Sequence, residues 1–385
     1  MRRGIATTTK YNVMVEENLL GGLSPHGFLR RHWQKRPLLV RGALRRLPAV
    51  SRRGLAALAA RDDVESRLVR RQGRRWLLEH GPFPRAALAT MPSRNWTLLV
   101  QGFNHHASGA EALLQRFAFI PQARLDDVMA SYAAAGGGVG PHWDSYDVFL
   151  VQAVGRRVWS ICRPRPFAAL EGAPLRIIEG FEPEDEYLLE PGDMLYLPPG
   201  WGHDGVALEP SVTLSVGFRA PGGAELGAAF LDFLADRGVA DSVYRDPGLA
   251  PARRPAEIGT AMLAKSRAML ERIRWTRGDM DEFICTWLST PKPHIAFTRP
   301  ARPLTPRAFA RRLAGGDVVL DAKTRLLHRG DRLYVNGESI AARGRRYDAL
   351  RRLADARRLP GARLAAQPAA GLVYDWYRAG FLDIA

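Results

Sequence analysis

The sequence is poor in cysteine and contains no long apolar run. Its two cysteines, Cys162 and Cys285, lie far apart in the chain, which excludes a disulfide framework and the paired cysteines of a zinc ribbon. No stretch approaches the ~18 unbroken apolar residues of a membrane span. The first residues are basic, but Glu16 and Glu17 interrupt any apolar signal core. We therefore expect a cytoplasmic protein with no membrane segment and no secretory peptide.

Lysine is also scarce, because only five of the 56 basic residues are lysine and the other 51 are arginine. The net charge of +17 at pH 7 favours polyanionic partners such as nucleic acid or ribosomes. A GC-rich genome produces the same excess of arginine and alanine, so the charge is either functional or compositional. Arginine runs such as residues 70–75 (RRQGRR) and 351–358 (RRLADARR) are interpreted as solvated faces of helices.

The length and the changes of pattern along the chain predict three parts. A chain of 385 residues exceeds one ordinary core, since a domain takes roughly 150 residues. Within residues 1–221, the stretch from about 123 to 220 consists of short strands separated by glycine and proline, which predicts an antiparallel barrel or sandwich. Residues 222–290 have apolar side chains three and four apart, which predicts helices. Residues 291–385 read as helix, hairpin and helix, the outline of a winged-helix module. The predicted fold class is α+β.

Three polar side chains are candidates for a metal site. His142 and Asp144 are two residues apart at the start of a predicted strand, so that they share one face with Tyr146. His203 follows another strand in a turn rich in glycine and proline. Two histidines and one carboxylate make the facial triad that leaves coordination positions open in non-haem Fe(II) oxygenases. Tyr146 is expected to meet the substrate.

Arg157 is the candidate for binding a carboxylate. It alternates with Trp159, which should face the core, so Arg157 is expected to face inward as well. An inward arginine is unfavourable without an anionic partner, and no acidic residue nearby in the sequence supplies one. A guanidinium binds a carboxylate through two parallel hydrogen bonds, so a co-substrate with a distal carboxylate, such as 2-oxoglutarate, would fit. The alternative is that Arg156 faces inward instead.

Together these motifs resemble the JmjC-type ribosomal oxygenases, specifically the bacterial group that hydroxylates an arginine of a large-subunit ribosomal protein. The resemblance rests on the stretches GGGVGPHWDSYDVFLVQAVGRRVW (136–159), GDMLYLPPGWGHDGVALE (192–209), SVGFRAP (215–221) and FLRRHWQKRPLLVRGA (28–43). It implies a double-stranded β-helix of the JmjC and cupin jelly-roll type, followed by a helical dimerisation region and a winged-helix-like domain. It further implies Fe(II), 2-oxoglutarate and O2 as cofactor and co-substrates, a homodimer, and hydroxylation of an arginine β-carbon in the sixteenth protein of the large-subunit set.

The resemblance also assigns roles to individual residues. The iron ligands would be His142, Asp144 and His203, and Arg157 would hold the far carboxylate of 2-oxoglutarate. Asp127 and Tyr146 would hold the substrate guanidinium. Alternation places Met129 and Ser131 on the same face as Asp127. We expect Ser131 and Thr213 near the co-substrate and Met129 and Ser215 near the substrate, although parity leaves open whether Thr213 or Ser215 faces the site.

Three other functions stay open at this point. A related oxygenase could hydroxylate histidine or another residue. A non-redox metal-dependent cupin, such as an isomerase, would want further histidine or glutamate ligands and no inward arginine. A basic nucleic-acid-binding protein could carry a relic barrel, which the charge and the winged-helix outline favour slightly. We expect the C-terminal module to dock on a protein or ribosomal surface and not to bind DNA in a sequence-specific manner.

Overall fold

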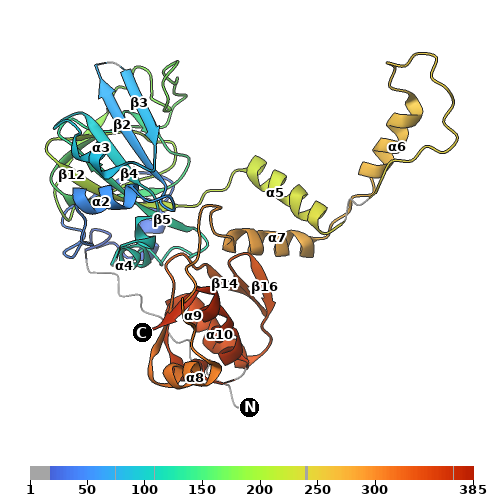
Figure 1. The fold of residues 1–385 in the computed structure, drawn as a ribbon. Coiled ribbons are helices and arrows are strands. Elements are labelled where there is room, and N and C mark those ends of the chain that lie inside the picture. Colours follow the sequence, from blue (N-terminus) through green and yellow to red (C-terminus); the bar gives the residue numbers. More distant parts are fainter. Residues whose placement is uncertain (1–17, 74, 108, 239–241, 367) are drawn as a thin grey trace, which may run out of the picture.

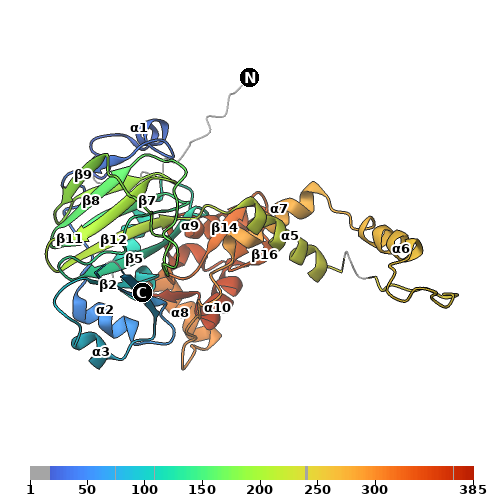
Figure 2. The ribbon, with the colours of Figure 1, turned by 90° about the horizontal axis from the view of Figure 1, so that it is seen from above.

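The computed structural model describes residues 18–73, 75–107, 109–238, 242–366 and 368–385. The N-terminal residues considered above as a possible signal segment lie outside this part. Figures 1 and 2 show a strand-rich body coloured blue to green, a helical arm coloured yellow to orange, and a red C-terminal body that lies beside the first. This arrangement confirms the predicted α+β class.

The strand-rich body is built from two antiparallel sheets. The larger has the order β1-β10-β7-β12-β5-β4-β2-β3 and the smaller the order β6-β11-β8-β9. The larger sheet contains β1 (Leu38–Val40), β2 (Ser66–Gln72), β3 (Arg75–His80), β4 (Trp96–Val100), β5 (Leu125–Ala133), β7 (Val148–Val154), β10 (Met194–Leu197) and β12 (Ser211–Phe218). The smaller contains β6 (His142–Trp143), β8 (Arg157–Cys162), β9 (Asp185–Leu189) and β11 (Gly202–Ala207). From β5 onward the chain crosses repeatedly between the two sheets, which confirms the double-stranded β-helix.

Alternation along the strands lets the larger sheet take part in two cores. Leu150 of β7 points toward the smaller sheet and packs in one cluster with Trp159 of β8. Phe149, on the opposite face, lies 5.5 Å from the ring of Phe28 on the first helix. Four helices accompany this body: α1 (Pro25–Arg31), α2 (Arg52–Ala59), α3 (Arg85–Ala89) and α4 (Ala110–Gln115). The inner face of the sheet is thereby left for the functional site.

One interpretation of the sequence is wrong in this body. Residues 70–75 do not form a solvated helix face, because they belong to the hairpin of β2 and β3, which turns at Gly73. The strand before the turn buries Ser66, Leu68 and Val69 and leaves Arg71 and Gln72 exposed. The run of arginines did not reveal this strand, since long charged side chains are tolerated on its open face.

The helical arm extends away from the rest of the molecule in both views. It consists of α5 (Gly223–Asp236), α6 (Thr260–Leu270) and α7 (Arg277–Ser289). Helix α6 buries none of its side chains within this chain. Helix α7 returns to the C-terminal body, where Asp281 and Glu282 pair with Arg329 and Arg332. In the described part of the chain no helix is long and apolar enough to cross a membrane.

The C-terminal body has the predicted order of helix, hairpin and helix. Its elements are α8 (Pro306–Gly315), β13 (Asp317–Leu320), β14 (Leu326–Arg329), β15 (Arg332–Val335), β16 (Glu338–Ala341), α9 (Asp348–Ala356), β17 (Arg358–Pro360), α10 (Ala369–Ala379) and β18 (Leu382–Ile384). Arg325 joins this body to the barrel, because its guanidinium donates to the carbonyls of Leu125 and Gln122, and its Nε to that of Leu288 in α7. The N-terminal end of β5 is therefore in direct contact with the winged-helix side.

Candidate metal centre and active site

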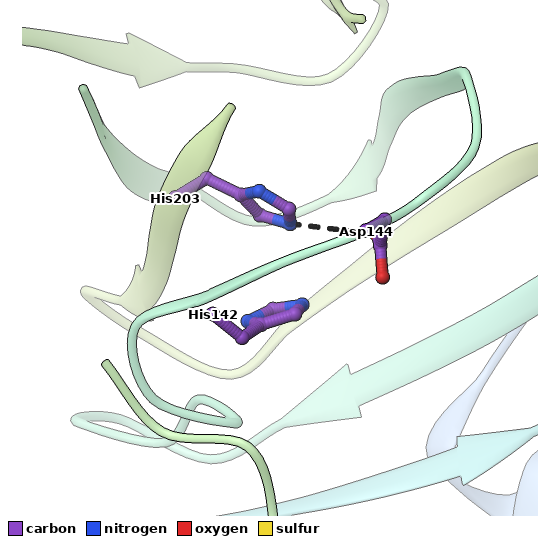
Figure 3. A group of neighbouring side chains, drawn as sticks. All are labelled: His142, Asp144 and His203. Carbon is purple, nitrogen blue, oxygen red and sulfur yellow. Dashed lines mark ion pairs between the residues drawn. The ribbon is translucent and has the colours of Figure 1, made fainter. Parts of the chain in front are cut away.

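Two histidines and one aspartate meet on the inner side of the smaller sheet. His142 begins β6 and His203 lies in β11, and the antiparallel pairing places the two residues directly opposite one another. The ring centroids are 4.2 Å apart, and Oδ2 of Asp144 lies 3.7 Å from Nε2 of His203. One ligand atom from each residue lies within 4.8 Å of the other two. Figure 3 shows the three side chains directed toward a common centre.

Both imidazoles are oriented through their Nδ1 atoms. Nδ1 of His142 lies 2.8 Å from the carbonyl of Gly140, and Nδ1 of His203 lies 3.0 Å from that of Trp201. Because a carbonyl only accepts, each Nδ1 carries the proton and each Nε2 offers its lone pair to the centre. Burial, and secondarily the neighbouring His142, lower the pKa of His203 to about 4. The ring is therefore neutral at physiological pH, as a metal ligand must be.

Gly140 is required at its position by both conformation and space. Its φ is +83°, which favours glycine. A Cβ there would lie 2.7 Å from Ile177 and 2.8 Å from Trp76. Any side chain would therefore displace the carbonyl that orients His142.

The aspartate is tied to the turn that carries the third ligand. The backbone carbonyl of Asp144 accepts from the N–H of Gly200, at 2.8 Å, in the turn just before His203. The expectation that Asp144 and Tyr146 continue a strand from His142 is wrong, because β6 ends at Trp143 and the chain bends. The ligands converge through this turn and not through strand parity.

The donor set fits divalent iron. Two neutral imidazoles and one carboxylate are the ligand set of non-haem Fe(II) oxygenases, and they would hold the metal while leaving positions open for other ligands. The side chains of His203 and Asp144 are 3% and 22% exposed, so the centre lies at the wall of a cavity and is reachable. That cavity is lined, beside the three ligands, by Asp127, Met129, Ser131, Tyr146, Arg157 and Ser215.

Arg157 faces inward, as expected, and Arg156 faces outward. The Arg157 guanidinium donates to the hydroxyl and carbonyl of Ser131 and to the hydroxyl of Ser211, at 3.2–3.3 Å, and its Nε has no hydrogen-bond partner. Burial lowers its pKa to about 10. Among the described residues no carboxylate lies within 4.0 Å of it, whereas Arg156 pairs with Glu209. A buried, charged guanidinium without an anion is a site for a carboxylate ligand.

Asp127 lies at the opposite part of the cavity wall, at the beginning of β5. Its carboxylate is 4% exposed and accepts from Nε2 of Gln101 at both oxygens, at 2.8 and 2.9 Å. The Nζ of Lys292 lies 3.0 Å from Oδ2. Burial, and secondarily the charge of Asp126, raise the pKa of Asp127, against the opposing effects of Lys292 and Gln101.

The structure places Ser215, and not Thr213, at the cavity. Both are on the inner face of β12, but the hydroxyl of Thr213 donates to Oε1 of the buried Gln152 at 2.8 Å. Ser215 pairs with Met129 across to β5, and both side chains line the cavity. The expected contact of Thr213 with the co-substrate therefore lacks support, because that hydroxyl already has a partner behind the cavity wall.

Sequence reasoning missed two residues that contact the predicted substrate aspartate. Gln101 comes from the end of β4, and Lys292 from the segment after α7. Neither belongs to a motif around the metal ligands. Only the scarcity of lysine could have drawn attention to Lys292, which stands between two prolines in a chain that otherwise uses arginine.

Comparison with known proteins agrees with this geometry. The JmjC domain family matches residues 112–226, and the ROXA-like winged helix family matches residues 272–383. The ribosomal protein uL16 3-hydroxylase of Escherichia coli (strain K12) is 37% identical over 316 residues, which are 81% of this chain and 84% of that protein. The X-ray structure of E. coli ycfD superposes with a TM-score of 0.81 at 34% identity, covering 94% of this chain and 98% of that one. The structure of the E. coli ribosomal oxygenase YcfD with cobalt and 2-oxoglutarate superposes with a TM-score of 0.78 at 33% identity and the same coverage.

The double-stranded β-helix, the facial triad and the unpaired Arg157 define the JmjC class of 2-oxoglutarate-dependent oxygenases. With the winged-helix domain and the extent of these similarities, the chain belongs to the ribosomal oxygenase family.

Proposed function

We propose that the protein is an Fe(II)- and 2-oxoglutarate-dependent oxygenase that hydroxylates the β-carbon of an arginine in a large-subunit ribosomal protein, the sixteenth of the set. The observation that carries the choice of arginine is the buried carboxylate of Asp127 in the wall of the metal cavity. The printed activity of the E. coli relative, uL16 3-hydroxylation, supports the same substrate.

The roles of the residues follow from their positions. His142, Asp144 and His203 would hold the iron, which with 2-oxoglutarate and O2 supplies the oxidation that turns C–H into C–OH. Arg157 would bind the distal carboxylate of 2-oxoglutarate through its free donor positions. Asp127 would bind the substrate guanidinium and so determine which side-chain carbon lies against the metal.

Arginine is favoured over histidine by the charge of the pocket. A buried carboxylate selects a permanently charged, planar cation, which it can bind through both oxygens. A neutral imidazole could not replace the charge of Lys292, which lies 3.0 Å from Oδ2 of this carboxylate. Tyr146, which is 39% exposed at the cavity, would cover the aliphatic part of the bound side chain.

The decisive experiment is a turnover assay by mass spectrometry. Purified protein, Fe(II), ascorbate and 2-oxoglutarate are incubated with peptides that tile the basic ribosomal proteins. We expect a gain of one oxygen on a single arginine of the sixteenth large-subunit protein. Oxygen on a histidine peptide alone would contradict the arginine assignment and support the alternative.

Replacing Asp127 by asparagine is expected to suppress arginine hydroxylation while the metal centre stays intact. The amide has nearly the same shape but cannot neutralise a guanidinium. Loss of one partner of a buried charge pair costs about 2–5 kcal/mol, which is roughly 30-fold or more in kcat/KM. Steady-state assays check this, and an unchanged KM for 2-oxoglutarate together with unchanged metal binding is the internal control. Wild-type kcat/KM in Asp127→Asn would exclude the carboxylate from substrate recognition.

The exposed arm supports a homodimer as part of this proposal. Large apolar side chains exposed in the arm are Leu231, Val243, Leu249, Ile258, Met262, Leu263, Leu270, Trp275 and Ile284. An apolar surface of this kind, which includes a helix that buries nothing in its own chain, needs a partner. We assign that partner to a second copy of the same arm.

Replacing Leu270, which is 70% exposed, by glutamate is expected to convert the dimer into a monomer. A charge in an apolar interface is left without a partner, so association weakens by several kcal/mol. Light scattering coupled to size exclusion measures the mass. Leu208→Glu, at an equally apolar exposed site on the barrel, is the control and should stay dimeric. An unchanged mass in Leu270→Glu would remove this arm from the interface.

We place the activity in the cytoplasm, where ribosomal proteins are made. The winged-helix side would dock on the ribosomal protein or particle and not read a DNA sequence. Sequence-selective binding of duplex DNA, measured by footprinting, would contradict this assignment.

A further inference from the structure

Asp126 and Asp127 lie between two cavities of the molecule. Both line the metal cavity, and both also line a second, smaller cavity between the barrel and the winged-helix side. Lys292 lines only the second cavity and reaches the two carboxylates from that side. Its Nζ lies 2.8 Å from Oδ2 of Asp126 and 3.0 Å from Oδ2 of Asp127.

Lys292 is the cation that neutralises Asp127 in the absence of a substrate. No other lysine or arginine among the described residues lies within 4.0 Å of its carboxylate. Arg67, which also lines the metal cavity, donates instead to Oε1 of Gln101. Without Lys292 the carboxylate would be buried with only an amide donor and with the like charge of Asp126 beside it.

The backbone holds Lys292 at this place from both sides. Pro291 and Pro293 flank it, and their rings fix φ on either side. The preceding residues are anchored by Arg219 at the end of β12, which donates to the carbonyls of Leu288 and Thr290. From the winged-helix side, Lys323 donates to the carbonyl of Ala296. The lysine is therefore positioned jointly by the barrel and the C-terminal body.

The hydrogen bonds of Asp127 show that Lys292 must move when a guanidinium binds at Oδ2. Each carboxylate oxygen accepts about two hydrogen bonds. Nε2 of Gln101 lies between the two oxygens and uses one position on each, and Lys292 uses the second position on Oδ2. That second position on Oδ2 is open to the substrate only when Lys292 leaves it. Lys292 can leave Oδ2 without losing a partner, because Asp126 already accepts from it.

We propose that Lys292 is the resting counter-ion of Asp127 and that it passes to Asp126 when the guanidinium of the substrate arginine takes its place. This inference rests on the proposed function, since it takes arginine as the ligand of Asp127. Lys292 acts through Asp127 and is a positioning residue. Only a cationic side chain can replace it without leaving a buried charge, so the exchange itself selects the substrate.

The exchange predicts how the substrate KM depends on pH. The charged and titratable groups around the carboxylate in the two cavities include Asp126, Tyr146, Arg67, Arg219 and Lys292, together with His105, Lys323 and Arg325 on the side of the second cavity. In Lys292→Met the nearest cation is gone, so burial and the charge of Asp126 raise the pKa of Asp127 further than in the wild type. A protonated carboxyl does not bind guanidinium. As pH rises through the raised pKa, the carboxylate forms and the competing lysine is absent.

The test compares wild type, Lys292→Met, Lys292→Arg and Lys35→Met. Lys35→Met removes the same charge from the surface, where Nζ of Lys35 donates to the carbonyl of Arg30 and not to Asp127. For Lys292→Met we expect the KM for an arginine peptide to rise about tenfold for each pH unit below the raised pKa of Asp127, because the carboxyl must lose its proton before it binds the guanidinium. Above that pKa the KM should equal the wild-type value or lie below it, because no lysine competes for Asp127. The kcat and the KM for 2-oxoglutarate should be unchanged. The KM of Lys292→Arg and that of Lys35→Met should show the same pH dependence as the KM of the wild type.

A purely structural lysine would give a different result. A loss of kcat in Lys292→Met that is equal at every pH, or a KM parallel to that of the wild type, overturns the inference while the proposed function stands. If the wild type oxidises no arginine peptide, both the proposed function and the exchange of Lys292 for the substrate guanidinium are contradicted. The counter-ion role is then decided by the ¹³C resonance of the Asp127 carboxyl in the protein without substrate. A higher titration midpoint in Lys292→Met than in the wild type supports that role, and identical titrations overturn it.

Discussion

Replacing Asp144 by alanine is expected to abolish hydroxylation and the consumption of 2-oxoglutarate. The carboxylate is the only anionic member of the triad, and without it two neutral imidazoles face a divalent cation whose charge nothing offsets. The backbone carbonyl of Asp144, which anchors Gly200, is untouched by the substitution. The fold should therefore survive while iron affinity is lost. Mass-spectrometric turnover and Fe(II) titration measure the two effects separately.

Asp185→Ala, in the exposed part of β9, is the control and should keep full activity. The thermal unfolding midpoint of Asp144→Ala without metal should stay close to that of the wild type, because the side chain loses a long contact of 3.7 Å to His203 and a hydrogen bond with Tyr146 at the cavity wall. If Asp144→Ala binds iron and turns over 2-oxoglutarate as the wild type does, these three residues are not the metal centre.

Local patterns in the sequence were sufficient to predict the barrel and the metal ligands. The strands of residues 125–218 are short, regularly spaced and separated by glycine and proline, so their existence follows from this spacing. The inward direction of Arg157 followed from its parity with Trp159, and the structure confirms it. The sequence argument selected Asp144 correctly, but its reason, that Asp144 continues the strand of His142, is wrong because β6 ends at Trp143.

Contacts between distant segments were beyond such reasoning. Nothing in the sequence near Asp127 points to Gln101 or to Lys292, which is 165 residues away. Their approach depends on how β4 pairs with β5 and on how the winged-helix side rests on the barrel. The hydrogen bond of Thr213 is another contact between distant segments, because Gln152 reaches Thr213 only through the pairing of β7 with β12.

Replacing Arg157 by methionine is expected to remove 2-oxoglutarate binding without destabilising the protein. Two charge-assisted hydrogen bonds to the distal carboxylate contribute about 3 kcal/mol or more, which is roughly 10²-fold or more in the KM for 2-oxoglutarate. Burial lowers the pKa of Arg157 to about 10, so the guanidinium is still charged at pH 7. The folded state disfavours this charge relative to the unfolded chain. Replacing the arginine therefore removes a free-energy cost of folding, which is present at pH 7 and diminishes only as pH rises through that pKa.

Loss of 2-oxoglutarate binding together with an unchanged or higher thermal stability distinguishes an arginine that binds a ligand from one that stabilises the fold. Methionine loses the bonds to Ser131 and Ser211 and the contact with the Trp159 ring at 5.9 Å, but it fills the space without a buried charge. The unfolding midpoint measured without ligand should therefore be equal to or above that of the wild type. Adding 2-oxoglutarate with a divalent metal should raise the midpoint of the wild type by mass action and leave that of Arg157→Met unchanged. If Arg157→Met instead unfolds at a clearly lower temperature and still responds to 2-oxoglutarate, the arginine stabilises the barrel and the co-substrate binds elsewhere.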